Sequence, residues 1–309
     1  MDVVLDVDTG VDDALAILFA VRDPSIDVRA ITCVTGNVAV DQVVANTLKV
    51  LDAAGAPEIP VARGCQQPLL EPVAGGRSVH GLDGLADLGL PPSSRRAAPV
   101  HAVELLRSTL AAAPRPVVLV TLAPLTNIAL LLRSYPEVMS AIERIVVMGG
   151  VARPETVGRS TDFNVAADPE AAAIVFGSGL PITMYGLDVF FDVTVIAADG
   201  ERLAESEDPG ARLAGRLILH QASRFGPDAA TLGDAGAVMA AFVPGGLRTR
   251  HGSVHIELAG NARGQTRVGP PPPATVRPED RSSHAEVALA IDPQRYRDLF
   301  LATLGRPER

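Results

Sequence analysis

The stretch Val3-Val-Leu-Asp-Val-Asp-Thr-Gly-Val-Asp-Asp-Ala-Leu-Ala-Ile17 decides how this chain folds. Its four carboxylates, which fall within eight residues, are Asp6, Asp8, Asp12 and Asp13. Apolar residues before the first pair predict a buried strand, Gly10 predicts a turn, and the apolar pattern after the second pair predicts a helix. Like charges this close repel unless a cation or shared protons hold them, so the stretch predicts a metal site at the end of a first parallel strand.

Composition favours a well-buried globular protein. The chain has 309 residues, of which 47% are hydrophobic and 20% charged. This length allows one large α/β domain or two small ones. No internal repeat or composition break marks a boundary, so we expect a single domain over residues 1–309. The net charge of −9 argues against a nucleic-acid backbone or an anionic membrane as the main partner and predicts a solvated acidic surface.

Cysteine usage and the start of the chain favour a cytoplasmic location. Cys33 and Cys65 are the two cysteines, too few for a disulfide scaffold, and this favours a reducing compartment. The carboxylate cluster begins at residue 6, which leaves no room for a signal peptide. No apolar run reaches membrane-spanning length. We therefore expect a cytoplasmic protein.

Short β-branched runs alternate with helical patterns along the chain. After the first strand, further strands are expected at Val28–Thr35, Ile59–Ala62, Val117–Leu122, Ile145–Met148, Ile182–Tyr185, Val254–Leu258 and Val287–Ile291. Helices are expected at Val40–Ala54, Val100–Ala112, Leu125–Arg133, Pro169–Phe176, within Ala211–Phe242 and at Tyr296–Leu304. Residues 63–98 predict a long surface loop, and Gly269–Pro273 an exposed spacer. The alternation predicts an α/β fold with a mostly parallel, Rossmann-like central sheet and helices on both faces.

Ligands of such sheets bind at the carboxyl ends of the strands, so the residues that follow each strand are candidates for a site. The second strand is followed by Asn37, and the strand at Val117–Leu122 ends in Leu122 itself. The next strand ends in Met148, and the loop after it contains Asp162-Phe-Asn164. A composite polar site is expected where these ends meet.

Two alternatives for the acidic stretch match it poorly. A calcium-binding helix–loop–helix needs an acid at the twelfth position of its loop, and none stands twelfth from Asp6 or Asp8. A phosphatase of the haloacid dehalogenase type also begins with a strand and Asp-x-Asp. However, it usually continues with Gly-Thr, whereas this chain has Thr9-Gly10, and its later lysine is missing because Lys49, the single lysine, lies in an early helix.

The stretch resembles the N-terminal signature of the inosine–uridine-preferring nucleoside hydrolases. Further matches follow in order: Gly36-Asn37, Ala62–Gly64 with Pro68-Leu69, His80-Gly81, Leu122-Ala-Pro-Leu-Thr-Asn127-Ile-Ala129, Val147-Met-Gly-Gly150, Asp162-Phe-Asn164, Asp168-Pro-Glu-Ala-Ala172, Gly186-Leu-Asp188 and Gly233-Asp234-Ala235. Each motif is weak alone, but the ordered series spans nearly the whole chain.

The resemblance implies the nucleoside hydrolase fold and an enzyme that cleaves the N-glycosidic bond of a ribonucleoside with one bound Ca²⁺. Asp8, Asp13 and Asp234 would supply carboxylate ligands, and Leu122 a backbone carbonyl. Calcium is a hard cation that accepts such oxygens. The family often forms dimers or tetramers, so a homo-oligomer is expected.

The reaction implied by the resemblance passes through an oxocarbenium-like transition state. A metal-bound water would attack, with Asp8 as the base that activates it. The substrate-binding residues would be Asp12, Asn37, His80, Met148, Asp162 and Asn164. Simpler roles stay open, because Asp12 could complement the helix dipole and the two asparagines could cap loops. Asp6 is expected to support the site from behind.

Two positions depart from the family pattern. Asp162 stands where the family commonly has glutamate, which reaches the 5′ end of the ribose. Gly233 stands where many members have a histidine that acts as acid towards the departing base, and the tryptophan used by another branch is missing because the chain has none. Candidate replacements are His80, His220, Tyr185, Arg224 and Phe225. A homologue that binds a ribosyl group without efficient hydrolysis is therefore the main alternative.

Overall fold

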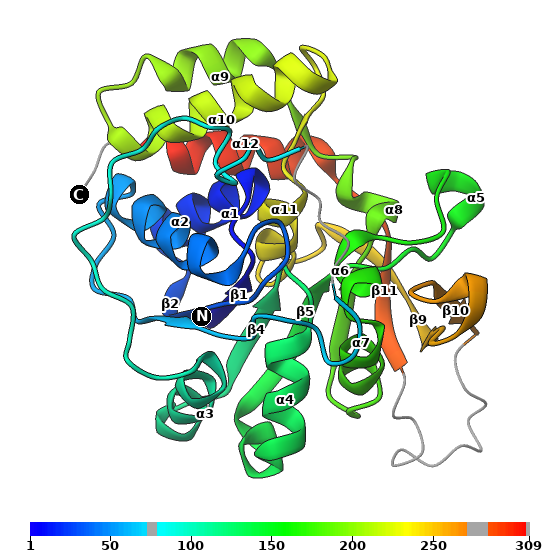
Figure 1. Cartoon of the computed structure of the whole chain (residues 1–309). Coiled ribbons are helices and arrows are strands. Elements are labelled where there is room, and N and C mark those ends of the chain that lie inside the picture. Colours follow the sequence, from blue (N-terminus) through cyan, green and yellow to red (C-terminus); the bar gives the residue numbers. More distant parts are fainter. Residues whose placement is uncertain (73–78, 271–283, 307–309) are drawn as a thin grey trace.

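The protein is built around one large twisted sheet with helices on both faces (Figure 1). The computed structural model describes residues 1–72, 79–270 and 284–306. Within these residues, the nine strands of the large sheet follow the order β10 (Thr266–Gly269), β9 (Leu247–Ile256), β11 (His284–Ile291), β6 (Ile182–Tyr185), β5 (Ile142–Met148), β4 (Val117–Thr121), β1 (Asp2–Val7), β2 (Asp27–Cys33) and β3 (Val61–Arg63). Residues 271–273 of the predicted spacer lie outside the described ranges.

Strand directions confirm the mostly parallel sheet. The strands from β3 through β2, β1, β4, β5 and β6 to β11 run parallel to their neighbours. The exceptions are β9, which pairs antiparallel with β11, and β10, which pairs antiparallel with β9. The sequence placed β9 at Val254–Leu258, but it is longer, and neither β10 nor the small antiparallel pair β7 (Thr194–Val195) and β8 (Ala230–Thr231) was expected.

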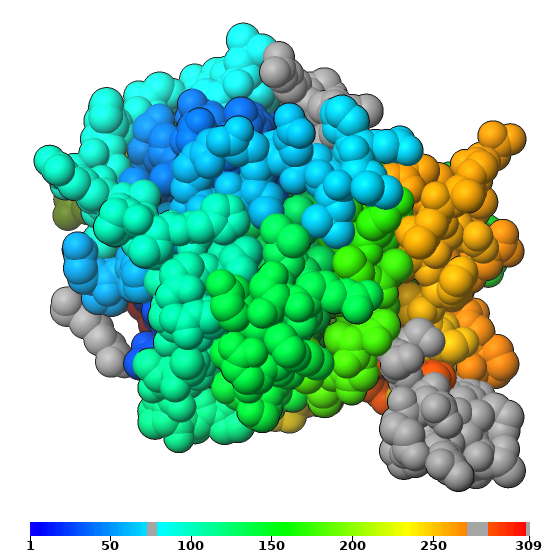
Figure 2. Space-filling model, turned by 60° about the horizontal axis from the view of Figure 1, so that its bottom comes forward, coloured from blue at the N-terminus to red at the C-terminus, as the bar shows by residue number. Residues whose placement is uncertain are grey.

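Helices cover both faces of this sheet and enclose two separate apolar clusters. One face carries α1 (Val11–Arg22), α2 (Val40–Ala53), α10 (Pro209–Phe225), α11 (Gly233–Ala240) and α12 (Pro293–Leu304). The other face carries α3 (Ala102–Ala112), α4 (Thr126–Ser134) and α7 (Pro169–Phe176), and Figure 2 shows α3 and α4 in teal and green towards the viewer. The predicted layering is confirmed.

Shorter elements complete the chain. They are α5 (Pro154–Val157), α6 (Phe163–Ala167), α8 (Leu187–Phe190), α9 (Ala197–Ala204) and the 3₁₀ turns η1 (Pro136–Ala141) and η2 (Gly260–Ala262). In the described ranges, every helix is too short or too polar to cross a membrane.

Strand β1 lies inside the sheet between β4 and β2, and all six of its residues are buried. Val3, Leu5 and Val7 contribute to one apolar cluster and Val4 to the other. A strand buried on both sides needs such a continuous apolar run. Because parallel neighbours end together, β1 delivers its following carboxylates to the edge where β2, β4 and β5 also end.

The long loop predicted after β3 is confirmed over its described parts, and residues 73–78 of it lie outside the described ranges. Its described parts, 64–72 and 79–101, contain no helix or strand. It is nevertheless anchored, because Leu85 is 1% exposed within the core and Asn46 Nδ2 donates to the carbonyl of Asp83 at 2.8 Å. This anchoring places His80 next to the end of β1.

Candidate metal and substrate site

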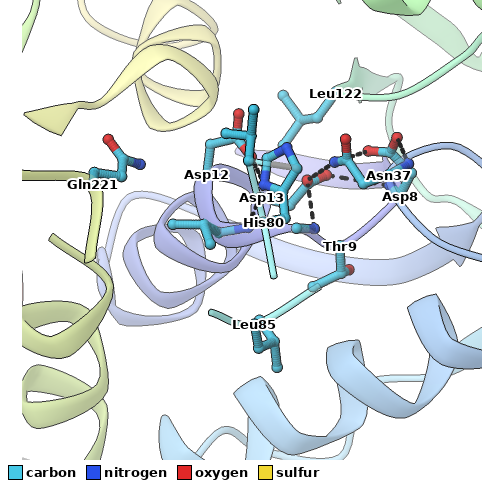
Figure 3. Close-up of polar contacts among 12 residues, drawn as sticks. Asp8, Thr9, Asp12, Asp13, Asn37, His80, Leu85, Leu122 and Gln221 are labelled. Atoms are coloured by element: carbon cyan, nitrogen blue, oxygen red, sulfur yellow. Dashed lines mark hydrogen bonds and ion pairs between the residues drawn. The ribbon is translucent and has the colours of Figure 1, made fainter. Parts of the chain in front are cut away.

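Asp8 and Asp13 lie side by side at the end of β1 and share Asn37 as a hydrogen-bond donor (Figure 3). Asn37 donates its backbone N–H to Asp8 Oδ2 at 2.8 Å and its side-chain Nδ2 to Asp8 Oδ1 at 3.1 Å. The Asp13 carboxylate accepts the backbone N–H groups of Asp8 at 3.2 Å and Gly10 at 2.9 Å. The turn between β1 and α1 therefore fixes both acids.

Two glycines make this arrangement possible because neither site has room for a side chain. A Cβ on Gly10 would lie 2.6 Å from His80 Nδ1, and one on Gly36 would lie 1.9 Å from Asp8 Oδ2. The Gly-Asn pair after β2 thus permits the backbone to approach the carboxylate closely. His80 closes the site from the loop, since its Nδ1 accepts the N–H of Val11 at 3.1 Å.

Asp12, Asp13 and Asp234 form the acidic cluster, in which one oxygen from each residue lies within 4.8 Å of the others. The first two begin α1 and the third begins α11, and these helices pack against each other. Asp12 Oδ1 is buried, has no hydrogen-bond partner among the described residues, and lies 3.6 Å from His80 Nδ1. Residues more than 200 positions apart in sequence therefore converge on one point.

Burial and mutual repulsion disfavour ionised carboxylates here. Burial raises the pKa of Asp13 to about 7, and the charge of Asp12 adds to the effect. Burial also raises the pKa of Asp8 well above its usual range, as does the charge of Asp13. Asp234 shows the same direction of pKa shift, from burial first and then from the neighbouring aspartates. A cation would reverse this cost by favouring the charged forms.

The donors of the acidic cluster are all oxygens, and this chemistry fits a hard divalent cation. Its unpartnered oxygen and raised pKa values are the properties expected of carboxylates that hold such an ion. The cluster as the structure presents it includes Asp12, whereas Asp8 adjoins it through the shared Asn37. The residues present could therefore hold a metal ion.

Asn164 connects the ends of β4 and β5. Its Nδ2 donates to the carbonyl of Leu122 at 2.9 Å and to the carbonyl of Met148 at 3.1 Å, and it also contacts Met148 Sδ at 3.1 Å. The Leu122 N–H in turn donates to the carbonyl of Asp6 at 2.8 Å. The backbone of Leu122 is thus held on both sides.

Asp162 begins α6 as its N-cap residue. Its Oδ1 accepts the N–H of Val165 at 3.1 Å, and its Oδ2 accepts the N–H of Gly150. Burial raises its pKa, although these N–H groups oppose the shift. The predicted substrate contact therefore has both carboxylate oxygens engaged by backbone groups.

A cavity of about 220 Å³ opens above these residues. The predicted residues that line it are Asp8, Asp12, Asn37, His80, Leu122, Met148, Asp162, Asn164 and Asp234. Asp13 contacts its floor from below. A larger cavity of about 740 Å³ lies beside β6 and β9, but it contains none of the acidic cluster. Chemistry rather than size therefore identifies the smaller cavity as the site.

Six lining residues were missed by the sequence reasoning: Val79, Arg159, Phe163, Leu187, Phe190 and Phe191. Most are apolar and form a wall beside the polar floor. Phe190 and Phe191 lie at the end of α8, the short helix that follows β6, so their position soon after a parallel strand was the available signal. Arg159 had no signal in the sequence, because it lies in an irregular segment between two very short helices.

The ring of Phe190 leaves no room for a histidine at position 233. A Cβ on Gly233 would lie 2.0 Å from Phe190 Cε2 and 2.2 Å from its Cζ. The aromatic ring of Phe190 therefore occupies the space that a side chain at position 233 would need.

The other candidate replacements, His220, Tyr185, Arg224 and Phe225, do not line the cavity. His220 Nε2 bonds to the carbonyl of Val79 at 3.1 Å, next to His80. Tyr185 is fully buried against Gly236, and burial raises its pKa well above the usual range. Phe225 is 53% exposed at the end of α10. Of the residues considered, His80 alone reaches the cavity.

Asp6 lies behind the floor, as the supporting role predicts. Its Oδ1 accepts from Thr32 Oγ1 at 2.6 Å and from Asn127 Nδ2 at 2.9 Å. Asn127 also donates to the carbonyl of Cys33 at 3.1 Å and accepts the N–H of Cys65 at 3.0 Å. Burial raises the pKa of Asp6 to about 7. This network joins the ends of β1 and β2 to the loop after β3.

Comparison with known proteins identifies the relatives of this fold and site. The sequence profile of the inosine-uridine preferring nucleoside hydrolases matches residues 3–298. The chain belongs to this family. It is accordingly an enzyme of the N-glycosidase class, and the family resemblance read from the motifs is confirmed.

Individual relatives agree over most of their length. The pyrimidine-specific ribonucleoside hydrolase RihA of Shewanella sp. (strain MR-7) is 35% identical over 308 residues, which cover 98% of this chain and 96% of the relative. RihA of Photobacterium profundum is 40% identical over 237 residues, 75% of this chain and 76% of its own. The plant nucleoside hydrolase PpNRh1 has a TM-score of 0.88 at 28% identity, with 99% of both chains covered. The purine-preferring ribonucleoside hydrolase from Gardnerella vaginalis has a TM-score of 0.86 at 29% identity, with 98% of both chains covered.

Proposed function

We propose that this protein is a calcium-dependent ribonucleoside hydrolase that releases ribose and a free base. One observation carries the proposal: the acidic cluster, whose members come from opposite ends of the chain, lies at the floor of a ligand-sized cavity. Such a floor would supply the ribosyl end of a nucleoside with a metal ion and with fixed hydrogen-bonding groups.

The proposed metal ligands are the carboxylates of Asp8, Asp13 and Asp234 and the backbone carbonyl of Leu122. We favour Ca²⁺ because it takes six to eight oxygen ligands in flexible geometry, whereas Mg²⁺ demands a near-ideal octahedron and keeps more water. When bound, calcium supplies positive charge that orients the ribose diol and lowers the pKa of a neighbouring water. Asn164 supports the fourth ligand, since it binds the Leu122 carbonyl.

We propose Asp8 as the base that takes a proton from the attacking water. Two hydrogen bonds from Asn37 hold its carboxylate at the cavity floor, so the direction of proton transfer is fixed. With calcium bound, the charge of the cation would keep the Asp8 carboxylate ionised, which is the form a base needs.

The remaining floor residues would orient the ribose. Asp12 would accept a ribose hydroxyl with its unpartnered Oδ1, and Asn37 and Asn164 would fix the diol. His80 and Met148 would contact the sugar from either side. Asp162 would act by holding the loop at Gly150 rather than through a free carboxylate, since its oxygens are engaged.

Base preference, assembly and location are further proposals. The relatives compared above include pyrimidine-specific and purine-preferring enzymes, so we propose a ribonucleoside substrate of either kind. A homo-oligomer, either a dimer or a tetramer, and a cytoplasmic location follow from the family resemblance and from the sequence. We also propose that residues 1–309 act as one domain.

Ribose release from a panel of purine and pyrimidine nucleosides, with calcium or with chelator, tests the proposal. We expect turnover with calcium that chelator abolishes, and an Asp8→Asn variant that binds calcium weakly and turns over at least about a hundredfold more slowly. Metal-independent turnover, or full turnover by the variant, would contradict it. Calcium-dependent binding of ribose without turnover of any nucleoside would instead favour the ribosyl-binding alternative. The lack of an acid at position 233, where the chain has Gly233, supports that alternative.

A further inference from the structure

The cavity has two unlike halves. Its floor carries the acidic cluster and the amides, whereas its wall carries the rings of Phe163, Phe190 and Phe191. When the glycosidic bond of a nucleoside with a neutral base breaks, the bonding electron pair goes to the base. Negative charge therefore develops on the side of the apolar wall, where charge is poorly solvated.

No acid can stand beside Phe190 at position 233, because the ring fills that space. Two cavity-lining side chains can carry positive charge, His80 and Arg159. His80 Nδ1 lies at the floor, 3.1 Å from the N of Val11 and 3.6 Å from Asp12 Oδ1. Arg159 is thus the cation of the wall.

The position of Arg159 is defined by the aromatic pair. Its guanidinium carbon lies 5.8 Å from the centre of the Phe191 ring, a cation–π distance. The Phe191 ring meets the Phe190 ring edge to face, with their centres 5.0 Å apart. Arg159, Phe191, Phe190 and Gly233 therefore form a continuous series that ends next to the ligand Asp234.

The charge of Arg159 lacks a neutralising partner among the described residues. In the described part of the chain it has no carboxylate partner, whereas Arg153 of the same segment pairs with Asp188 at 3.1 Å. Asp162, three residues further along, directs both oxygens to backbone N–H groups. The guanidinium is therefore available to a group inside the cavity.

We propose that Arg159 stabilises the negative charge that develops on the departing base and so replaces a proton donor. This inference rests on the proposed function. The C1′–N bond breaks, its electron pair passes to the base, and the guanidinium N–H groups donate to the oxygen or nitrogen acceptors conjugated with that nitrogen. Water that has lost a proton to Asp8 adds to C1′ as hydroxide. Solvent water then protonates the departed base, and the hydroxide that this leaves takes the proton from Asp8.

A comparison of substrates with neutral and with cationic bases tests this role. Arg159→Gln should lower kcat/KM about tenfold for uridine and inosine, whose bases leave as anions. Nicotinamide riboside carries a cationic base that leaves neutral, so Arg159 repels the base until the bond has broken. For this substrate the same variant should leave kcat/KM unchanged or raise it. A role limited to holding the loop would lower both.

Three controls sharpen the comparison. Arg159→Lys keeps the charge and should retain most of the activity on uridine. Arg248→Gln removes another exposed arginine, which lies in β9 outside the cavity, and should change the activity on neither substrate. Unfolding temperatures of all variants should match, since Arg159 is exposed. Equal loss on both substrates, or no change on either, would overturn the inference.

Binding separates this inference from the proposed function. If the calcium-loaded protein hydrolyses no nucleoside, the proposed function fails, and calorimetric titration with nicotinamide riboside still tests Arg159. We expect the Arg159→Gln variant to bind this cation several-fold more tightly than the wild type, with uridine affinity unchanged. Equal affinity of both proteins for nicotinamide riboside would overturn the inference.

Discussion

Gly36→Ala tests whether the position of Asp8 governs catalysis. The added Cβ would lie 1.9 Å from Asp8 Oδ2, and ordinary contact begins at 3.4 Å, so one group must move by 3.4 − 1.9 = 1.5 Å. The φ of Gly36 is not in the left-handed region, so alanine meets no backbone strain there. The carboxylate is therefore the obstacle.

Moving Asp8 by this distance breaks its 2.8 Å hydrogen bond from the Asn37 backbone. Misplacement of a catalytic group by about 1 Å costs on the order of a hundredfold in rate. We expect kcat for a good nucleoside substrate to fall by about that factor. The stabilisation by calcium should also shrink, because Asp8 is a proposed ligand.

The assay combines turnover with thermal unfolding in calcium and in chelator. Gly89→Ala is the matched control: its φ of +65° is strained for alanine, but an added Cβ meets nothing within 4 Å. This control should lose about 1 kcal/mol of stability and keep its turnover. Full activity and a full calcium shift in Gly36→Ala would refute the reasoning.

Three further predictions concern protons, support and the wall. Burial raises the pKa of Asp13 from its ordinary value of 3.8 to about 7 in the folded metal-free protein, so between these pH values the folded state binds a proton that the unfolded state lacks. The stability of the metal-free protein should therefore fall as pH rises from about 4 to 7, and the calcium-induced rise in unfolding temperature should grow over pH 6 to 8. A calcium-induced rise that does not depend on pH would contradict this. Asn127→Ala should destabilise the protein by about 1–3 kcal/mol in urea unfolding, because it removes one donor from Asp6 Oδ1 and the partner of the Cys33 carbonyl and of the Cys65 N–H. An unchanged midpoint would argue against the network. Gly233→His should lower the unfolding temperature because the imidazole clashes with the Phe190 ring, and adding Phe190→Ala to that variant should restore it. Equal unfolding temperatures of the single and double variants would show that the ring moves aside without cost.

The sequence predicted the elements whose side chains face one consistent environment. The apolar run of β1 and the spacing after it identified both the strand and α1, because both are buried almost throughout. Ile182–Tyr185 and Pro169–Phe176 were predicted to the residue, and Asp168 caps the latter by accepting the N–H of Ala171 at 3.1 Å.

The sequence did not predict the elements that depend on tertiary contacts. The first half of β9 exposes Arg248 and Arg250, which carry no apolar alternation, yet pairing with β11 makes it a strand. The helix α6 has only five residues and depends on Asp162 as its cap. Short elements such as this one are formed by tertiary contacts, and local pattern does not encode them.

The candidate site divides in the same way. The floor could be predicted because the carboxyl ends of parallel strands lie at one edge of the sheet. Asp8, Asn37 and Leu122 could therefore be grouped from their positions at or after strand ends. The wall could not be predicted, because the Phe190 ring packs in the space beside Gly233. That residue is 43 positions away and has no side chain to indicate the contact.

This division has a consequence for substrate choice. The floor is fixed by a network that includes Asp6, Asn127 and Asn164, so a substitution there disturbs the sheet as well as the chemistry. Arg159 and Phe191 are exposed and lie outside the strands, so substitutions there should cost the fold little. Under the proposed roles, specificity for the ribosyl end would be tied to stability, whereas specificity for the base would depend on residues that can vary more independently of it.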